Sequence, residues 1–277
     1  MIDLHTHSTY SDGTLAPAEI VRSAHEAGLA AVSITDHDSV DGLADGRAEA
    51  QRLGIEFVDG CELSVYEDDL QVHILGYFVD TSNPTFLTQL ENLRTLRDER
   101  NDLMLLALAR LGIRISSDDL LKVASSRLVT RAHIARALVN LGHCRTIQEA
   151  FDTYIGFGQP AFVPHSSISA QSCVELILSV GGFPSLAHPY SYKLSPRELN
   201  RVITLLAGYG LRGLECYYHN HTPSLTKHAL EIANKNHLLP TGGSDFHGEN
   251  RPGVSLGCGS GNLCVPLKVL DDMKNWR

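Results

Sequence analysis

The sequence has 277 residues, of which 43% are hydrophobic and 20% are charged, and its formal net charge is −9. These proportions are ordinary for a globular protein that forms one large domain or a domain with an insertion. The acidic balance argues against a sequence-independent grip on duplex DNA, and no apolar run approaches the roughly 20 residues that cross a bilayer. The six cysteines form no CxxC pair and no export signal precedes them, so we expect a cytoplasmic protein with reduced thiols and no membrane anchor.

Strands and helices are predicted to alternate along most of the chain. The first helix is predicted at 15–28, with Pro17 in its first turn and Gly28 as its end, and the second at 40–53, followed by Gly54. Such alternation implies a parallel sheet with helices outside it. A closed barrel fits better than an open sheet, because polar residues cluster at the C-terminal end of every strand. The predicted strands are residues 1–4, 30–34, 55–63, 70–78, 181–189, 211–218 and 237–245.

Residues 84–164 interrupt this pattern with helices alone. The chain leaves the predicted barrel after the fourth strand and returns before the fifth. We therefore expect a barrel made of residues 1–83 and 165–277, and an inserted all-helical subdomain that forms a lid or wall over the barrel mouth. Helices are predicted within the insert at 85–112, 116–125, 130–142 and 146–156.

Potential metal ligands follow one predicted strand after another, beginning with "DLHTHSTYSDG" at residues 3–13. The C-terminal ends of the strands in a parallel barrel open on one face, so ligands far apart in the sequence meet there. Nine side chains exceed the four to six that one ion takes, and a bridging carboxylate such as Glu62 suits two or three ions. Imidazole and carboxylate without thiolate suit Mn²⁺, Zn²⁺ or Fe²⁺. The nine are His5, His7, Asp12, His37, Glu62, His73, His188, Asp245 and His247.

The motifs "DLHTHSTYSDG", "ITDHD", "GCELS", "HILGY", "AHP" and "GSDFHG", in this order, resemble the PHP (polymerase and histidinol phosphatase) family of metal hydrolases. The resemblance covers the chain apart from the insert. It implies a distorted (β/α)₇ barrel, an α/β fold, with a trinuclear metal centre, for which we expect Mn²⁺, with Zn²⁺ and Fe²⁺ as alternatives. In the family pattern one ion takes His5, His7, Glu62 and Asp245, a second takes Glu62, His73 and His188, and a third takes Asp12, His37 and His247.

The insert points to one branch of that family. Its "TRAHIARAL", with "HPYSYKLS" further on, is similar to the subgroup that removes phosphate from 3′,5′-bisphosphorylated nucleosides, such as adenosine 3′,5′-bisphosphate to AMP. Close relatives in that subgroup trim short RNA from its 5′ end. We therefore expect a phosphomonoester hydrolase that uses hydroxide formed from metal-bound water, acts on a small phosphorylated nucleotide and needs no obligate protein partner.

Three alternatives remain beside this activity. The first is a 5′–3′ exoribonuclease on short RNA oligomers, which would share the metal centre but needs a groove open to longer chains. The second is a histidinol phosphatase. The third is a non-catalytic, metal-stabilised module, against which the complete set of ligands argues.

Polar residues outside the ligand set are candidates for binding a second phosphate, because guanidinium groups match phosphate oxygens. Thr130 is predicted to cap the helix that carries Arg131 and His133, and these two, with Asp36 beside His37, are candidates for supporting catalysis. The alternative for the arginines near residue 100 is a solvated helix face, and for the two histidines near residue 220 a polar loop. The substrate-binding candidates are Arg97, Arg100, Asn101, Arg131, His133, Lys193, His219 and His221.

Overall fold

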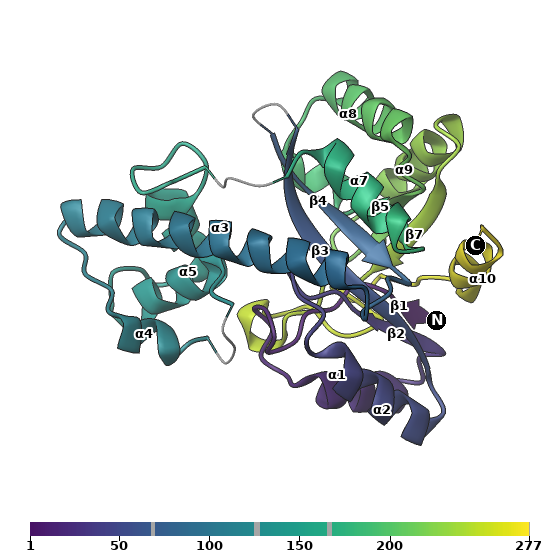
Figure 1. Cartoon of the computed structure of the whole chain (residues 1–277), viewed down its shortest axis with the longest axis horizontal. Coiled ribbons are helices and arrows are strands. Elements are labelled where there is room, and N and C mark those ends of the chain that lie inside the picture. The colour runs from purple at the N-terminus through teal and green to yellow at the C-terminus, as the bar shows by residue number, and fades with distance from the viewer. Residues whose placement is uncertain (68–69, 125–127, 165–167, 277) are drawn as a thin grey trace.

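The computed structural model describes residues 1–67, 70–124, 128–164 and 168–276, and within them seven strands form one sheet in chain order (Figure 1). The sheet is nearly closed, because the segment after the first strand pairs with the last one. The amide of Leu4 donates to the carbonyl of Gly242 at 3.2 Å, and the amide of Asp245 donates to that of His5 at 2.8 Å. This confirms the predicted barrel. Its strands are β1 (Ile2–Asp3), β2 (Ala31–Ile34), β3 (Glu56–Glu67), β4 (Leu70–Tyr77), β5 (Phe183–Leu186), β6 (Gly213–Tyr218) and β7 (Leu239–Gly243).

The direction of β4 departs from the predicted parallel sheet. It runs antiparallel to both β3 and β5, whereas the other neighbouring pairs are parallel. The expectation of a parallel sheet is wrong at this strand, because only residues 68–69 separate β3 from β4, and a parallel crossover needs a dozen or more. The beginning of β4, rather than its end, therefore lies at the mouth of the barrel.

Among the described residues, six α-helices belong to the barrel part of the chain. Pro17 opens the first of them as predicted, and Gly54 ends the second with φ at 72°, a left-handed conformation that glycine adopts without a Cβ clash. Ile20 and Val21 on the first helix are fully buried in the same core as Val32 of β2. These helices are α1 (Pro17–Glu26), α2 (Leu43–Leu53), α7 (Ala170–Ser179), α8 (Pro196–Tyr209), α9 (Pro223–Lys235) and α10 (Leu267–Trp276).

The described part of residues 84–164 contains helices and no strand, as the sequence predicts. It projects to one side of the barrel (Figure 1). Its elements are α3 (Pro84–Arg110), α4 (Ser117–Leu121), α5 (Arg131–Asn140), α6 (Ile147–Ala150) and the π-helical turn η1 (Phe151–Ile155). The helix predicted at 116–125 is shorter in the structure, and Ser125 lies outside the described residues.

The long helix α3 belongs to two hydrophobic cores. Phe86 and Leu90 in its first half lie in the barrel core, and Met104 and Leu108 in its second half lie in a separate core with Ile134 of α5. This second core supports the division into barrel and insert, which we keep as a proposal. The second predicted boundary, between residues 164 and 165, falls at the edge of residues 165–167, which lie outside the described residues.

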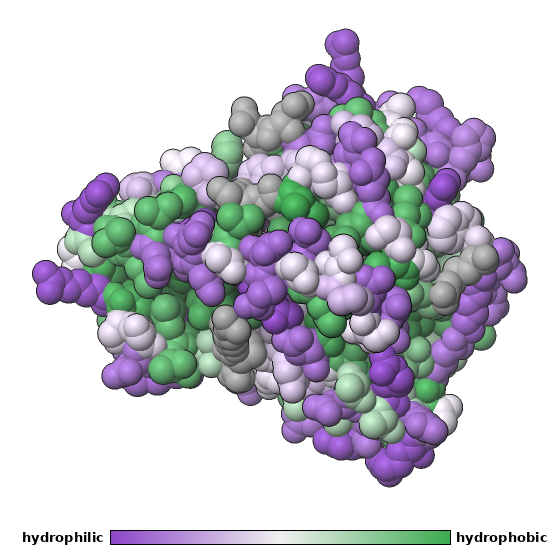
Figure 2. All heavy atoms as spheres, viewed as in Figure 1, coloured by the Kyte–Doolittle hydropathy of each residue, from purple (hydrophilic) through white to green (hydrophobic). Residues whose placement is uncertain are grey.

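Polar and hydrophobic residues are mixed on the face of the molecule shown in Figure 2, over the barrel and the insert alike. None of the described helices combines the length and the apolar character that crossing a bilayer requires.

Candidate metal centre

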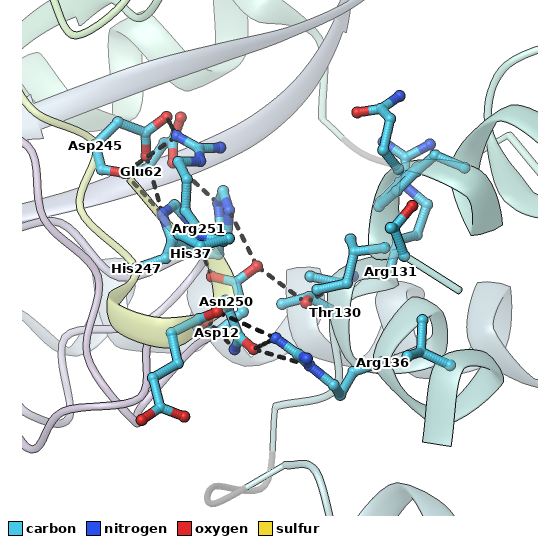
Figure 3. A pocket seen from close by; sticks show the side chains of 18 of the residues that line it. Asp12, His37, Glu62, Thr130, Arg131, Arg136, Asp245, His247, Asn250 and Arg251 are labelled. Carbon is cyan, nitrogen blue, oxygen red and sulfur yellow. Dashed lines mark hydrogen bonds and ion pairs between the residues drawn. The ribbon is translucent and has the colours of Figure 1, made fainter. Parts of the chain in front are cut away.

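The structure brings the nine predicted ligands together at the mouth of the barrel. They come from the segments after β1, β2, β5 and β7, from the loop before α1, and from within β3 and β4. His73 joins them although β4 runs backwards, because it lies near the beginning of that strand. Five of the nine, Asp12, His37, Glu62, Asp245 and His247, are labelled in Figure 3.

Glu62 lies at the centre of this cluster. Its Oε1 is 2.8 Å from Nδ1 of His73 and 2.9 Å from Nε2 of His188. Its Oε2 is 3.2 Å from Nε2 of His7 and 3.1 Å from Nδ1 of His37. Oε2 also lies 3.5 Å from Nε2 of His5. The two oxygens therefore face different sets of imidazoles, as would suit a carboxylate shared between two ions.

Two further carboxylates complete the cluster. Oδ1 of Asp245 lies 3.4 Å from Nε2 of His5 and 3.3 Å from Nε2 of His7. Oδ1 of Asp12 lies 3.3 Å from Nε2 of His247. Three subsets are close enough to share an ion each: His5, His7 and Asp245; His37, Glu62 and His73; and His7, Asp12, His37 and His247. Each subset overlaps one of the family-implied groups, although the second contains His37 in place of His188. The assignment of ligands to individual ions remains a proposal.

The charges of the buried cluster fit divalent cations. Burial alone would raise the pKa of Glu62, but His37, His73 and His5 hold this pKa well below its usual range. Burial alone would lower the pKa of His7, but its hydrogen bonds to Asp245 and Glu62 raise that pKa to about 9. The same direction holds for the pKa values of Asp12 and Asp245, so the cluster favours ionised carboxylates. Buried charges are normally paired or bound to metal, and Asp12 Oδ1 has no hydrogen-bond partner within the described part of the chain, so the residues fit a bound cation.

Glu215 on β6 holds two of the histidines in place, and the sequence analysis missed it. Its Oε1 lies 2.9 Å from Nδ1 of His5, and its Oε2 accepts the amide of His188 at 2.6 Å. The contact at Nδ1 leaves Nε2 of His5 to face Asp245. A carboxylate bonded to the second nitrogen of a ligating histidine fixes the orientation of its ring. A glutamate inside the apolar strand "GLECYY" is the signal that could have identified it.

Asp36, a predicted supporting residue, is linked to the ligand His7 through hydrogen bonds. Its carboxylate accepts the amide of Ser8 at 2.8 Å and the hydroxyl of Ser11 at 2.5 Å, and that hydroxyl lies 3.3 Å from Nδ1 of His7. Asp36 is buried and does not line the pocket described next. It acts on His7 through Ser11 rather than on a substrate.

A pocket of about 620 Å³ lies between the cluster and the insert (Figure 3). Two of the predicted substrate-binding residues, Arg97 and Arg131, line it. Arg97 is buried and pairs with Asp38, whose Oδ2 accepts its Nε–H at 3.1 Å, so it does not belong to a solvated helix face. Arg131 donates from Nη2 to Gln71 of β4 at 2.9 Å. Both guanidinium groups border the space in front of the metal cluster.

Three more arginines line the pocket and were not predicted: Arg136 on α5, Arg145 before α6, and Arg251 after β7. Arg251 pairs with Asp245 and also donates to the hydroxyl of Tyr218 at 3.3 Å. No motif surrounds these arginines, and only the folded chain aligns them. The pocket therefore has an acidic and imidazole floor and a strongly cationic wall.

The other predicted substrate-binding residues lie outside the pocket lining: Arg100, Asn101, His133, Lys193, His219 and His221. Asn101 donates to the carbonyl of Val129 at 2.7 Å, and His133 accepts the amide of Thr130 at 3.1 Å. His221 bonds the carbonyl of Cys216 at 2.9 Å. These contacts hold loops and helix ends in place. Lys193 is exposed, and His219 lies 3.2 Å from the hydroxyl of Ser260.

Arg100 is unusual because Nε and Nη2 of its buried side chain have no hydrogen-bond partner among the described residues. Burial, together with the charges of Arg97 and Arg131, lowers its pKa to about 9.

Residues 3–158 match the PHP domain. Over 92% of this chain and 90% of the relative, the sequence is 34% identical to the 3′,5′-nucleoside bisphosphate phosphatase of Chromobacterium violaceum. Over 88% of this chain and 89% of that protein, it is 32% identical to the 5′-3′ exoribonuclease of Haemophilus influenzae. A solved structure from Chromobacterium violaceum, described as an amidohydrolase with bound sulfate and no metal, superposes with a TM-score of 0.88 at 31% identity, over 99% of this chain and 96% of that one.

Proposed function

Because the chain belongs to the PHP family and is a metal-dependent phosphoesterase, we propose that it releases phosphate from nucleoside 3′,5′-bisphosphates. The observation that carries this proposal is the pairing of a nine-residue acid and imidazole cluster with a wall of arginines across one pocket. A substrate with two phosphates matches both sides, since one can meet the floor while the other meets the wall.

The nine predicted ligands would hold the divalent cations, and Mn²⁺ is the ion that we propose. Bound cations lower the pKa of water and neutralise charge on phosphate oxygens. The residues of the chain do the rest. Glu215 and Asp36 hold His5 and His7 in orientation, directly and through Ser11. Arg131 and Arg97 offer guanidinium groups to a second phosphate, and this contact would orient the scissile ester toward the floor.

The activity is tested by measuring phosphate release from a panel of phosphate esters with Mn²⁺-loaded protein. The panel comprises adenosine 3′,5′-bisphosphate, adenosine monophosphates, a sugar phosphate, histidinol phosphate, and a di- and a tetranucleotide. We expect the bisphosphate to turn over fastest, the activity to disappear after chelation, and Mn²⁺ to restore it. Asp245→Asn should abolish turnover, whereas Asp271→Asn, which changes an exposed aspartate on α10, should not. Metal-replete protein that turns over no phosphorylated nucleotide contradicts the proposal.

A 5′–3′ exoribonuclease activity on short RNA is the second candidate. The observation that favours it is the continuation of the pocket lining from Arg131 to Arg145 and Gln148, which provides polar contacts for more than one nucleotide. The relative from Haemophilus influenzae bears that name at a similar level of identity. A tetranucleotide cleaved faster than the bisphosphate would favour this activity over the first.

A further inference from the structure

We propose that Thr130 and Asn250 are positioning residues for Asp12, and that they couple cation binding at Asp12 to the seating of the insert on the barrel. The inference rests on the metal centre contained in the proposed function, but not on the identity of the substrate. We call the contact region the Asp12 junction; it consists of Asp12, Thr130, Arg136 and Asn250.

Thr130 has its single hydroxyl proton directed at Asp12. The hydroxyl oxygen accepts the amide of Ala132 at 3.2 Å, as the N-cap of α5. It lies 3.0 Å from Oδ2 of Asp12, and both residues are buried. Because a carboxylate cannot donate, the hydroxyl must be the donor in that contact. The insert thus makes a buried, charge-assisted hydrogen bond to a predicted metal ligand.

This contact fixes the orientation of the Asp12 carboxylate. Oδ2 accepts the Thr130 hydroxyl and lies 3.8 Å from Nε2 of His37, and Oδ1 has no hydrogen-bond partner among the described residues. Oδ1 faces Nε2 of His247 at 3.3 Å and Nδ1 of His7 at 3.8 Å. Thr130 therefore turns Asp12 toward the histidines with which it could share an ion.

The main chain of Asp12 is held by the same helix through a second route. The side-chain amide of Asn250 donates to the carbonyl of Asp12 at 2.8 Å. Its oxygen accepts Nη2 of Arg136 at 2.9 Å, and Arg136 also donates to the carbonyl of Glu249 at 3.2 Å. These residues face one another across the boundary between barrel and insert in Figure 3. Helix α5 thus reaches both the carboxylate and the backbone of one ligand.

Coupling follows from this double attachment. The helix that bonds Asp12 also carries Arg131 and Arg136 of the pocket wall. When the insert packs against the barrel, its contacts hold Asp12 in the orientation that binds a cation. Because coupling between two binding events is reciprocal, a bound cation stabilises the packed position of the insert by the same free energy. Metal loading would therefore set the position of the cationic wall.

The first test is an Mn²⁺ titration, followed by electron paramagnetic resonance, of Thr130→Val and Thr130→Ser. We expect Thr130→Val to weaken one class of Mn²⁺ site by about tenfold to a hundredfold, and Thr130→Ser to retain the native affinity. Thr222→Val is the control, because the Thr222 hydroxyl also caps a helix, accepting the amide of Leu225 at 3.2 Å at the start of α9 in the barrel part of the chain. It should lower thermal stability without changing the titration. Native affinity at every site in Thr130→Val overturns the inference.

The second test is hydrogen exchange of residues 131–140 with and without Mn²⁺. We expect Mn²⁺ to slow exchange there in the unmodified protein, and to slow it less in Asn250→Ala, which leaves the cap of α5 intact. If Thr130→Val does not fold, the Asn250→Ala titration answers the question instead. Exchange that Mn²⁺ does not change overturns the coupling. Both measurements are independent of turnover. If the variants hydrolyse nucleotides normally and bind Mn²⁺ normally, only this inference is removed. If Mn²⁺ binding is weakened in the variants but the unmodified protein cleaves no nucleotide, only the proposed function is removed.

Discussion

The floor and the wall of the pocket differ in how firmly the fold holds them. Each floor residue follows or lies within a barrel strand or a short loop beside one, and Glu62 by itself lies near five histidines. The wall consists of arginines on helices and loops; Arg131 bonds one residue of β4, and Arg145 is exposed. The hold on the wall is uneven, because Arg97 pairs with Asp38 and Arg251 with Asp245. A densely bonded floor suits one fixed chemistry, whereas the exposed part of the wall, at Arg145, can adapt to different substrates.

Glu62→Gln provides the strongest test of the floor. The loss of one charge facing five histidines should cost several kcal/mol of transition-state stabilisation, which is about a thousandfold or more in kcat. Steady-state phosphate release measures this effect. Glu56→Gln, at the exposed start of the same strand, serves as the control and should keep native kcat. A loss below tenfold in Glu62→Gln would show that the centre does not depend on this bridge.

Glu215→Gln should have the next largest effect, because it weakens the hold on His5 while leaving every predicted ligand in place. We expect Mn²⁺ affinity to fall by about tenfold to a hundredfold, with kcat recovering at saturating Mn²⁺. Isothermal titration with Mn²⁺ measures the affinity. Glu231→Gln, an exposed glutamate on α9, is the control. Unchanged Mn²⁺ affinity in Glu215→Gln would mean that the floor holds His5 without it.

Arg131→Gln tests the wall separately from the floor. Losing a charged hydrogen bond to phosphate should raise KM for adenosine 3′,5′-bisphosphate by about tenfold to a hundredfold. For a substrate with one phosphate, both KM and Mn²⁺ affinity should stay close to native values. The control is Arg110→Gln at the exposed end of α3. Equal changes for both substrates would show that Arg131 does not distinguish the second phosphate.

The smallest effect is expected at Arg100, and it concerns stability. Arg100→Met removes a buried cation whose Nε and Nη2 have no hydrogen-bond partner in the part of the chain that the structure describes, so the free energy of unfolding should rise by about 1 kcal/mol. Arg97→Met, three residues earlier, leaves Asp38 buried without its cation and should lower it by about 3 kcal/mol. Denaturant unfolding of both variants measures the difference. A destabilised Arg100→Met would indicate that its guanidinium has a partner in solution.

The sequence predicted the floor far better than the wall, for a physical reason. Ligands at strand ends are brought together by topology alone, so motif order was sufficient for Asp12 and Asp245. His73 was predicted to join the cluster, although its strand was expected to run parallel to its neighbours. It does join the cluster, because β4 is reversed and the beginning of β4, where His73 lies, is at the mouth of the barrel. Glu215 was missed because a single carboxylate in an apolar strand has no motif around it.

The wall depends on where helices of the insert come to rest, and periodicity does not determine this. Arg97 and Arg131 were identified by charge and both line the pocket, but Arg100, one turn further along α3, does not. Arg136 and Arg251 had no distinguishing neighbours, and their contacts with Asn250 and Asp245 exist only in the folded chain.

The reversed direction of β4 also sets the length of α3. Because β4 ends at the side of the barrel away from its mouth, the chain must travel back before it can cover the opening. The first half of α3, from Pro84 to Arg97, provides about 20 Å for that return, since Arg97 already lines the pocket, and the second half carries the core of the insert. The length of the helix therefore determines the position and orientation of the insert. One added residue would rotate everything beyond it by about 100°. A whole added turn would shift the insert by about 5 Å with nearly the same orientation. Helix length, as well as side-chain identity, can thus set how large a substrate fits.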